Sequence, residues 1–108
     1  MPTLHYAPAA TRTLTCLERG RRADSLKLRR VRRALDQLAT DPRHPGLRTH
    51  RYHALPGHTG RRVFDSYAWT GAGAWRIYWT WGPDTTARPE HDGQDDAVLT
   101  VLLIGPHR

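Results

Sequence analysis

The stretch AWRIYWTWG, residues 74–82, decides how the rest of the chain must fold. Its side chains separate with period two, which is typical of a β-strand whose successive residues point to opposite faces of a sheet. Three tryptophans and an isoleucine fall on one face: Trp75, Ile77, Trp79 and Trp81. The other face carries Arg76, Tyr78 and Thr80. We therefore expect the first face to be a core wall and the second to be a polar stripe on a rigid surface.

Further strands are predicted on both sides of this stretch. TLHY (residues 3–6) suits an edge strand, and LRTHRYHAL (47–55) and RRVFDSYAW (61–69) alternate around the turn cluster PGHTG. AVLTVLLIG (97–105) has the length of a buried strand. Residues 83–96, PDTTARPEHDGQDD, are poor in apolar residues and longer than a normal hairpin loop. They are predicted to form a mobile acidic loop.

Two helices are predicted between the first strand and the others. PAATRTLTCLERG (8–20) opens with proline and closes with glycine, the usual asymmetry of helix ends. The next segment has an apolar stripe at spacings of three, four and three: Leu28, Val31, Leu35 and Leu38. Asp24 or Ser25 would cap this second helix, and the pair Asp41 and Pro42 would stop it.

The predicted order is β-α-α-β-β-β-β, a single α+β domain over residues 1–108. We expect the N-terminal helical hairpin to pack on one face of a small antiparallel sheet. The other face would be left open, with the polar stripe of residues 76, 78 and 80 upon it.

The charge of the chain is strongly basic and unevenly placed. The formal net charge is +7, but residues 1–62 carry +10 and residues 63–108 carry −3. All but one of the 17 cations are arginine, whose guanidinium forks onto phosphate and stacks on bases. A polyanionic partner, either nucleic acid or an acidic protein, is the first interpretation. The alternative is an arginine-rich composition that reflects a GC-rich genome and a soluble surface.

Several classes of protein are disfavoured by the composition. No apolar run approaches the roughly 20 residues needed to cross a bilayer, and the first residues do not have the pattern of a signal peptide. The single cysteine, Cys16, excludes a disulfide within the chain and suits a reducing compartment. A cytoplasmic protein without membrane contact is therefore expected.

Three segments resemble a known family in their order along the chain. They are HPGLRTHRYHALPG (44–57), AWRIYW (74–79) and VLTVLLIGPHR (98–108). With the preceding helical hairpin, this layout resembles the RelE/ParE superfamily of bacterial type II toxins. The resemblance implies a toxin-antitoxin system, with a cognate antitoxin as partner. In the RelE-like branch the toxin is an mRNA interferase, an endoribonuclease that cuts mRNA on the ribosome without a metal and inhibits translation. In the ParE-like branch it inhibits DNA gyrase.

The RelE-like branch is the favoured interpretation, and its reaction is attack of a ribose 2′-hydroxyl on the adjacent phosphate. This chemistry requires a base, an acid and a cation over the phosphate. Arg76 matches the strand arginine of the family and would clamp the phosphate; alternatively it shields the aromatic rings or pairs with Asp65. His107 would be the acid or base and Arg108 would stabilise the phosphate charge, unless both belong to a frayed tail.

Asp65 and Tyr67 lie two residues apart and therefore on one strand face. If Phe64 and Ala68 meet the helices, Asp65 and Tyr67 join Arg76 on the opposite face. Asp65 would then be a base, and Tyr67 a stacking or proton-donating group. The alternative is a structural ion pair between Asp65 and Arg76.

A second set of residues is predicted to bind RNA. Four come from the strand before the turn cluster, three from the second helix and one from the end of a strand: Arg48, His50, Arg51, His53, Arg29, Arg30, Arg33 and Trp69. Phosphate contacts by such cations add affinity that is blind to sequence and falls with salt. His50 or His53 would alternatively transfer a proton, the helix arginines would be a solvated surface, and Trp69 would stack or contact the antitoxin. No metal site and no cofactor are expected, because no suitable carboxylate or cysteine spacing accompanies the histidines.

The predicted partners are thus a cognate antitoxin, mRNA and the ribosome, with DNA gyrase as the alternative target. A protein that keeps the toxin fold and only binds RNA or protein is a third possibility.

Overall fold

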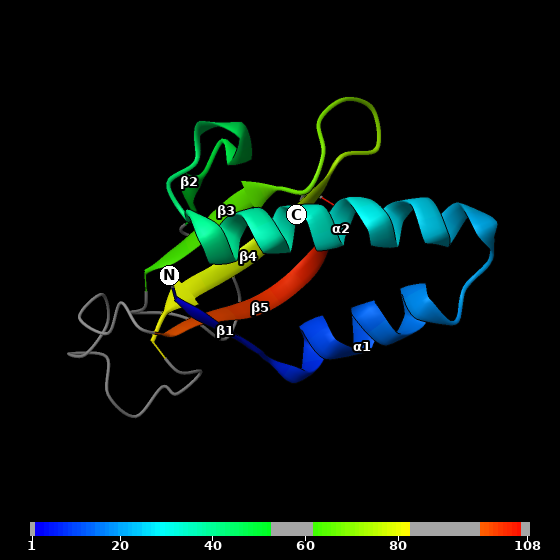
Figure 1. Ribbon diagram of the computed structural model, residues 1–108, viewed down its shortest axis with the longest axis horizontal. Coiled ribbons are helices and arrows are strands. Elements are labelled where there is room, and N and C mark those ends of the chain that lie inside the picture. The colour runs from blue at the N-terminus through cyan, green and yellow to red at the C-terminus, as the bar shows by residue number, and fades with distance from the viewer. Residues whose placement is uncertain (1, 53–61, 83–97, 107–108) are drawn as a thin grey trace.

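The computed structural model describes residues 2–52, 62–82 and 98–106. The elements, in chain order, are β1 (Thr3–Tyr6), α1 (Pro8–Glu18), α2 (Arg22–Thr40), the 3-10 turn η1 (Pro45–Leu47), β2 (His50–Tyr52), β3 (Val63–Tyr67), β4 (Trp75–Trp81) and β5 (Val98–Pro106). Figure 1 shows the two helices as a hairpin beside the sheet, with its turn projecting beyond the strands. The coarse class, α+β with two helices and five strands, is confirmed.

The sheet is mixed, and the prediction of a wholly antiparallel sheet is wrong at one edge. Its strand order is β1-β5-β4-β3-β2, in which β1 pairs with β5 in parallel and the remaining neighbours are antiparallel. The chain leaves the sheet at the C-terminal end of β1, and the helical hairpin returns it to the same end of the sheet. β2 therefore runs in the direction opposite to β1. Each later strand reverses direction again, and β5 therefore has the direction of β1.

Two predicted boundaries differ from the structure. The second helix begins at Arg22, before Asp24, and no side chain caps it. Asp24 instead lies in the first turn, where a carboxylate is stabilised by the helix dipole. The predicted strand 47–55 is shorter within the described residues, because Leu47 belongs to η1 and Arg48 has a positive φ of 48°.

The face of the sheet beneath the helices holds the main core. Apolar residues of α1 and α2, among them Leu17, Val31 and Leu38, pack against Ile77 and Trp79 of β4 and against β5. Trp75 and Trp81 are half-buried against the same core, so the predicted face of the tryptophan stretch is confirmed. Neither helix in the described ranges is long and apolar enough to cross a membrane.

The opposite face is not open, which corrects the expectation of an exposed polar stripe. Tyr78 is fully buried and packs with Val63 and Leu102, while Tyr52 meets its ring edge-on at 5.0 Å. Thr80 is also buried, and its hydroxyl donates to the carbonyl oxygen of Arg62 at 2.7 Å. Arg76 therefore lies in a packed surface, and its chemical role depends on the side chains that contact it.

Candidate functional site

Arg76 joins two other predicted site residues on the face away from the helices. Its Nη1 donates to Oδ2 of Asp65 at 2.6 Å, and its Nη2 donates to the hydroxyl of Tyr67 at 2.6 Å. The guanidinium carbon also lies 4.4 Å from the centre of the Tyr67 ring. The structure thus brings Asp65, Tyr67 and Arg76 into one hydrogen-bonded group.

The register of two strands produces this group. β3 and β4 are antiparallel with Tyr67 opposite Arg76, so both side chains leave the same face. Asp65 lies two residues earlier on β3 and points the same way. The intervening Ser66 points to the helical side, where its hydroxyl accepts a hydrogen bond from the Trp79 indole at 2.9 Å.

Burial and charge fix the protonation state of Arg76. Its side chain is 16% exposed and that of Asp65 only 2%. Burial lowers the pKa of the guanidinium, but the hydrogen bond and charge of Asp65, with those of Tyr67, more than offset this, so the net pKa lies above that of an ordinary arginine. Arg76 is therefore a permanent cation at neutral pH.

The second oxygen of Asp65 has an unusual environment. Oδ1 is buried and has no hydrogen-bond partner among the residues that the structure describes. Nδ1 of His50, the cross-strand neighbour of Asp65, lies 4.0 Å from this oxygen. His50 itself is largely exposed. Asp65 is thus placed to hold Arg76 on one side and to attract a protonated imidazole on the other, while its burial keeps solvent away.

A pocket of about 580 Å³ opens beside Arg76. Its polar side chains come from Arg48, Tyr67, Thr70 and Arg76, and the rest of its wall is formed by Gly71, Gly73, Ala74 and Pro106. No acidic side chain of the described residues lines it. A phosphate is the group that such a concave, cationic surface can receive, because two guanidinium groups and a hydroxyl donor converge there.

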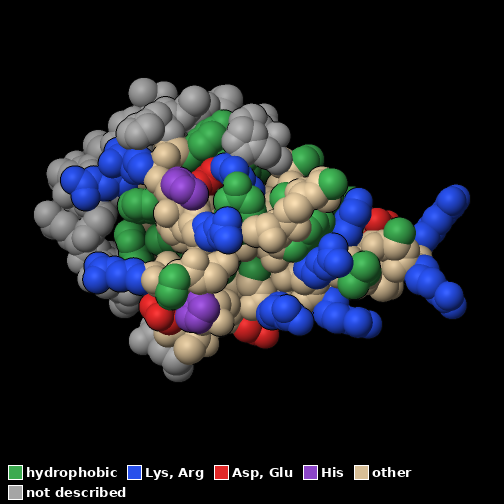
Figure 2. Space-filling model, turned by 90° about the horizontal axis from the view of Figure 1, so that it is seen from above, with side chains coloured by type: hydrophobic (Ala, Val, Ile, Leu, Met, Phe, Trp, Pro, Cys, Tyr) green, Lys and Arg blue, Asp and Glu red, His purple; other side chains and the backbone are tan. Residues whose placement is uncertain are grey.

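Two smaller hollows extend this surface towards α2. Both are lined by Arg33, Gly46, Tyr67 and Ala68, and one of them also by Arg30, Trp69 and Thr70. Within the described part of the chain, neither is lined by an acidic side chain. We call the three connected hollows around Tyr67 the basic groove. In Figure 2, Lys and Arg side chains are spread over the face seen from above and crowd towards the projecting helical end.

Trp69 is less available for stacking than the sequence suggested. Its ring stacks on Trp75 at 5.6 Å, and the guanidinium of Arg30 lies 5.4 Å from its centre. Lys27 lies similarly over Trp75. These cations extend along the aromatic pair, and Trp69 therefore links α2 to the sheet at the border of the basic groove.

Of the thirteen predicted site residues, seven meet in or directly beneath the groove: Arg30, Arg33, Arg48, Asp65, Tyr67, Trp69 and Arg76. Arg29 is exposed on α2 and lines none of the three hollows, and Arg51 points to the helical side opposite Phe64. His50 lies on the Arg76 face, beside Asp65. His53, His107, Arg108 and the predicted acidic loop lie outside the described residues.

Sequence reasoning did not place the turn after β3 in the wall of the pocket beside Arg76. Gly71 and Gly73 have φ values of 99° and 71°, which residues with a side chain rarely adopt. A methyl group at either position would meet no atom within 4 Å beyond its chain neighbours, so the conformation and not the space requires glycine there. The glycine-rich sequence TGAG, residues 70–73, is typical of a turn, but only the register of β3 and β4 places that turn beside Arg76.

No cluster of three or more His, Cys, Asp or Glu residues that could hold a metal ion occurs within 2–52, 62–82 and 98–106. Neither a family model, nor a curated protein, nor a solved structure matches this chain. The geometry of the basic groove therefore carries the functional argument.

Proposed function

We propose that this chain is a toxin of the RelE/ParE kind that binds mRNA on the ribosome in the basic groove and cleaves it, in the cytoplasm and under the control of an antitoxin. The observation that supports this most is the group formed by Arg76, Tyr67 and Asp65 at a cationic pocket of about 580 Å³. A phosphodiester seated there would meet Arg48 and Arg76, while the strand above would follow Arg30 and Arg33.

The proposed reaction is transfer of the phosphoryl group within the RNA. The ribose 2′-hydroxyl loses its proton to an imidazole and its oxygen forms a bond to phosphorus. The bond from phosphorus to the 5′-oxygen breaks, and that oxygen takes up a proton. A 2′,3′-cyclic phosphate and a 5′-hydroxyl result. The cations stabilise the charge that develops on the non-bridging oxygens.

Tyr67 is suited to donate the proton. Its hydroxyl oxygen accepts a hydrogen bond from Arg76, which leaves its own hydrogen for a substrate oxygen. The base would be His50, next to Asp65, or His107, which follows Pro106 at the pocket wall. Asp65 is 2% exposed, so we assign it a positioning role behind Arg76 and His50 in place of direct proton transfer.

A second function is favoured by the same ion pair. Asp65 neutralises much of the charge of Arg76, as in a structural pair, and an RNA-binding module without catalysis would also use the remaining arginines of the groove. This module would bind RNA with a steep salt dependence and leave it intact.

Expression of the chain in bacteria separates these functions. We expect growth and translation to stop and mRNA to be cleaved within codons, as mapped by primer extension. Cells should grow when they express Arg76→Lys, because lysine keeps the charge but lacks the fork that reaches both Asp65 and Tyr67. Growth on expression of His107→Ala would identify His107 as the base, and growth on expression of His50→Ala would identify His50. Arg12→Ala, an exposed arginine on α1, is the matched control and should remain toxic.

Each other outcome contradicts the cleavage proposal in its own way. Arrest with DNA breaks and intact message would indicate inhibition of DNA gyrase. RNA binding by the purified chain without cleavage, either alone or with ribosomes, would indicate the binding module.

A further inference from the structure

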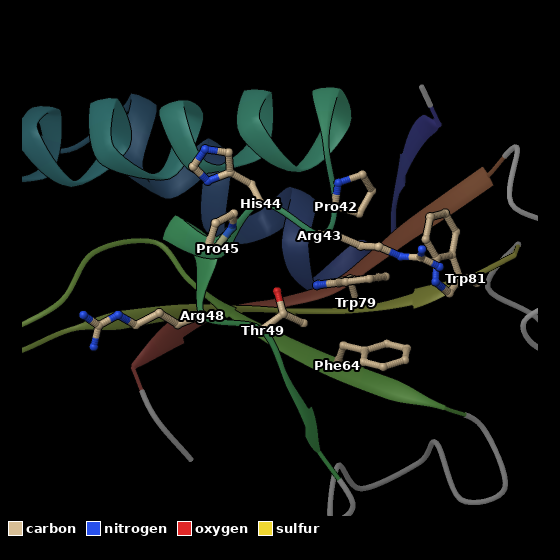
Figure 3. A pocket seen from close by; sticks show the side chains of 9 residues that line it. All are labelled: Pro42, Arg43, His44, Pro45, Arg48, Thr49, Phe64, Trp79 and Trp81. Carbon is tan, nitrogen blue, oxygen red and sulfur yellow. The ribbon is translucent and has the colours of Figure 1, made fainter.

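A second pocket lies on the other face of the sheet, away from Arg76. It has a volume of about 480 Å³ and occupies the corner where the chain leaving α2 crosses β3 and β4. Figure 3 shows its side chains: Phe64, Trp79 and Trp81 are aromatic, and Arg43, His44, Arg48 and Thr49 are polar. Arg48 also lines the pocket beside Arg76, and His44 also lines one of the smaller hollows, but the three aromatic residues and Arg43 take no part in the proposed RNA cleavage.

The aromatic rings form two walls that are nearly perpendicular. Phe64 and Trp79 are stacked, with centroids 4.8 Å apart and an interplanar angle of 27°. Trp81 stands at 89° to Trp79, with a centroid distance of 5.4 Å. A flat ring that stacks on one wall turns its edge towards the other, and both arrangements are favourable for aromatic groups.

The hydrogen bonds beneath the pocket leave the Trp79 wall apolar. The Trp79 indole N–H donates to the Ser66 hydroxyl at 2.9 Å, and Ser66 is 2.6 Å from the Thr49 hydroxyl. The one polar group of the Trp79 ring is therefore satisfied inside the protein. A ligand meets ring carbon atoms there, with Thr49 as the nearest hydroxyl.

The rim of the pocket favours an anion. Among the residues that the structure describes, no acidic side chain lines it, and Arg43 extends towards Trp81 without an ion pair to any of them (Figure 3). The Nδ1 atom of His44 accepts the Gly46 N–H at 3.0 Å, which places the proton of the neutral ring on Nε2. Both side chains can therefore donate to a ligand, and neither accepts from it.

We propose that this pocket binds a nucleotide, with its base against the aromatic corner and its phosphate on Arg43. The pocket lies within the roughly 300–1,000 Å³ range of small-molecule sites, and the combination of flat walls with a cationic rim matches a flat ring that carries an anion. An acidic peptide would match the charge, but it would not need two perpendicular ring faces.

Calorimetric titration of the purified chain with AMP tests the proposal. We expect saturable binding of AMP and about tenfold weaker binding of adenosine, which lacks the phosphate; charge-assisted hydrogen bonds of Arg to phosphate are worth this much. Arg43→Ala should weaken AMP binding about tenfold and leave adenosine binding unchanged. Arg12→Ala, which removes the same charge from α1, should change neither affinity.

Two further variants test the base and separate this site from the basic groove. Trp81→Leu should weaken both AMP and adenosine about tenfold, because stacking does not depend on the phosphate. Tyr67→Phe, on the opposite face, should leave AMP binding unchanged even if it abolishes RNA cleavage. Failure of the proposed nuclease and failure of the nucleotide pocket are thus distinguishable.

The source of the nucleotide is decided by a comparison of AMP with an RNA hexamer. Tighter, Arg43-dependent binding of the hexamer would indicate a nucleotide within an RNA chain, whereas equal affinities would indicate a free mononucleotide. AMP binding that is absent at millimolar concentration, or that is indifferent to both Arg43→Ala and Trp81→Leu, would overturn the proposal. So would an acidic peptide that displaces AMP at lower concentration.

Discussion

The two faces of the sheet are built by the same strands but differ in whether their buried polar atoms have hydrogen-bond partners. On the helical face, the buried Trp79 indole and the Ser66 and Thr49 hydroxyls form a closed chain of hydrogen bonds. On the other face, Oδ1 of the buried Asp65 has no partner in the described part of the molecule. Interiors nearly always satisfy buried polar groups. The unsatisfied face is therefore where we expect the proposed reaction, whereas the satisfied hydrogen bonds of the helical face stabilise the fold beneath the aromatic pocket.

The same contrast holds for the arginines. Arg30 lies along an aromatic ring on the helical side, where its charge faces solvent and its stem covers apolar surface. Arg76 is 16% exposed and held by two hydrogen bonds, which use only part of its five N–H donors. A fixed guanidinium with donors to spare is pre-organised for an anion, whereas a mobile one binds with a larger loss of entropy.

The largest effect on stability should come from the helical face. Trp79→Ala removes a ring that is 3% exposed, stacks on Phe64 and stands perpendicular to Trp81, so the free energy of unfolding should fall by about 4 kcal/mol. Urea unfolding followed by circular dichroism measures it. A loss below about 1 kcal/mol would show that the main core lies elsewhere.

Removal of the buried cation should have the next largest effect. Arg76→Ala leaves the Asp65 carboxylate buried without its partner and should cost about 3 kcal/mol in urea unfolding. The double variant Asp65→Leu, Arg76→Met should recover most of this loss, because paired apolar groups need no hydration. It should not recover toxicity. A double variant as unstable as Arg76→Ala would mean that packing, and not charge, holds this face together.

The sequence predicted the elements and their faces because both depend on local periodicity. The alternation of residues 74–82 placed four side chains on the helical face, and the spacing of two between Asp65 and Tyr67 placed both with Arg76. The same spacing allowed Asp65 to pair with Arg76 as an alternative to catalysis, and the hydrogen bond at 2.6 Å is there.

What could not be predicted depends on contacts between distant segments. The parallel pairing of β1 with β5 follows from strand order, which no local pattern encodes. The burial of Tyr78 follows from Val63 and Leu102 on neighbouring strands, so a residue on a polar stripe became part of a core. The left-handed conformation of Arg48, uncommon for a residue with a side chain, places it in the pocket of Arg76 and off the predicted strand.

A smaller effect is expected from the hydrogen bonds of the helical face. Ser66→Ala keeps the volume of the site but leaves the buried Trp79 N–H without its acceptor, which should cost about 2 kcal/mol in urea unfolding. Toxicity at a temperature where the variant is folded should be unchanged, because Ser66 does not face the basic groove. A selective loss of activity without a loss of stability would contradict the division between the two faces.

The smallest effect on stability should accompany a large effect on activity. Tyr67→Phe keeps the ring beneath Arg76 and removes only the hydroxyl that accepts from Nη2, so the free energy of unfolding should fall by about 1 kcal/mol. If Tyr67 donates the proton, cleavage of ribosome-bound mRNA should slow by about a hundredfold. Tyr6→Phe, at an exposed tyrosine of β1, is the control and should change neither quantity by much. If the cleavage rate of Tyr67→Phe falls only a few fold, in proportion to its small loss of stability, Tyr67 merely supports Arg76 and the proton comes from a histidine.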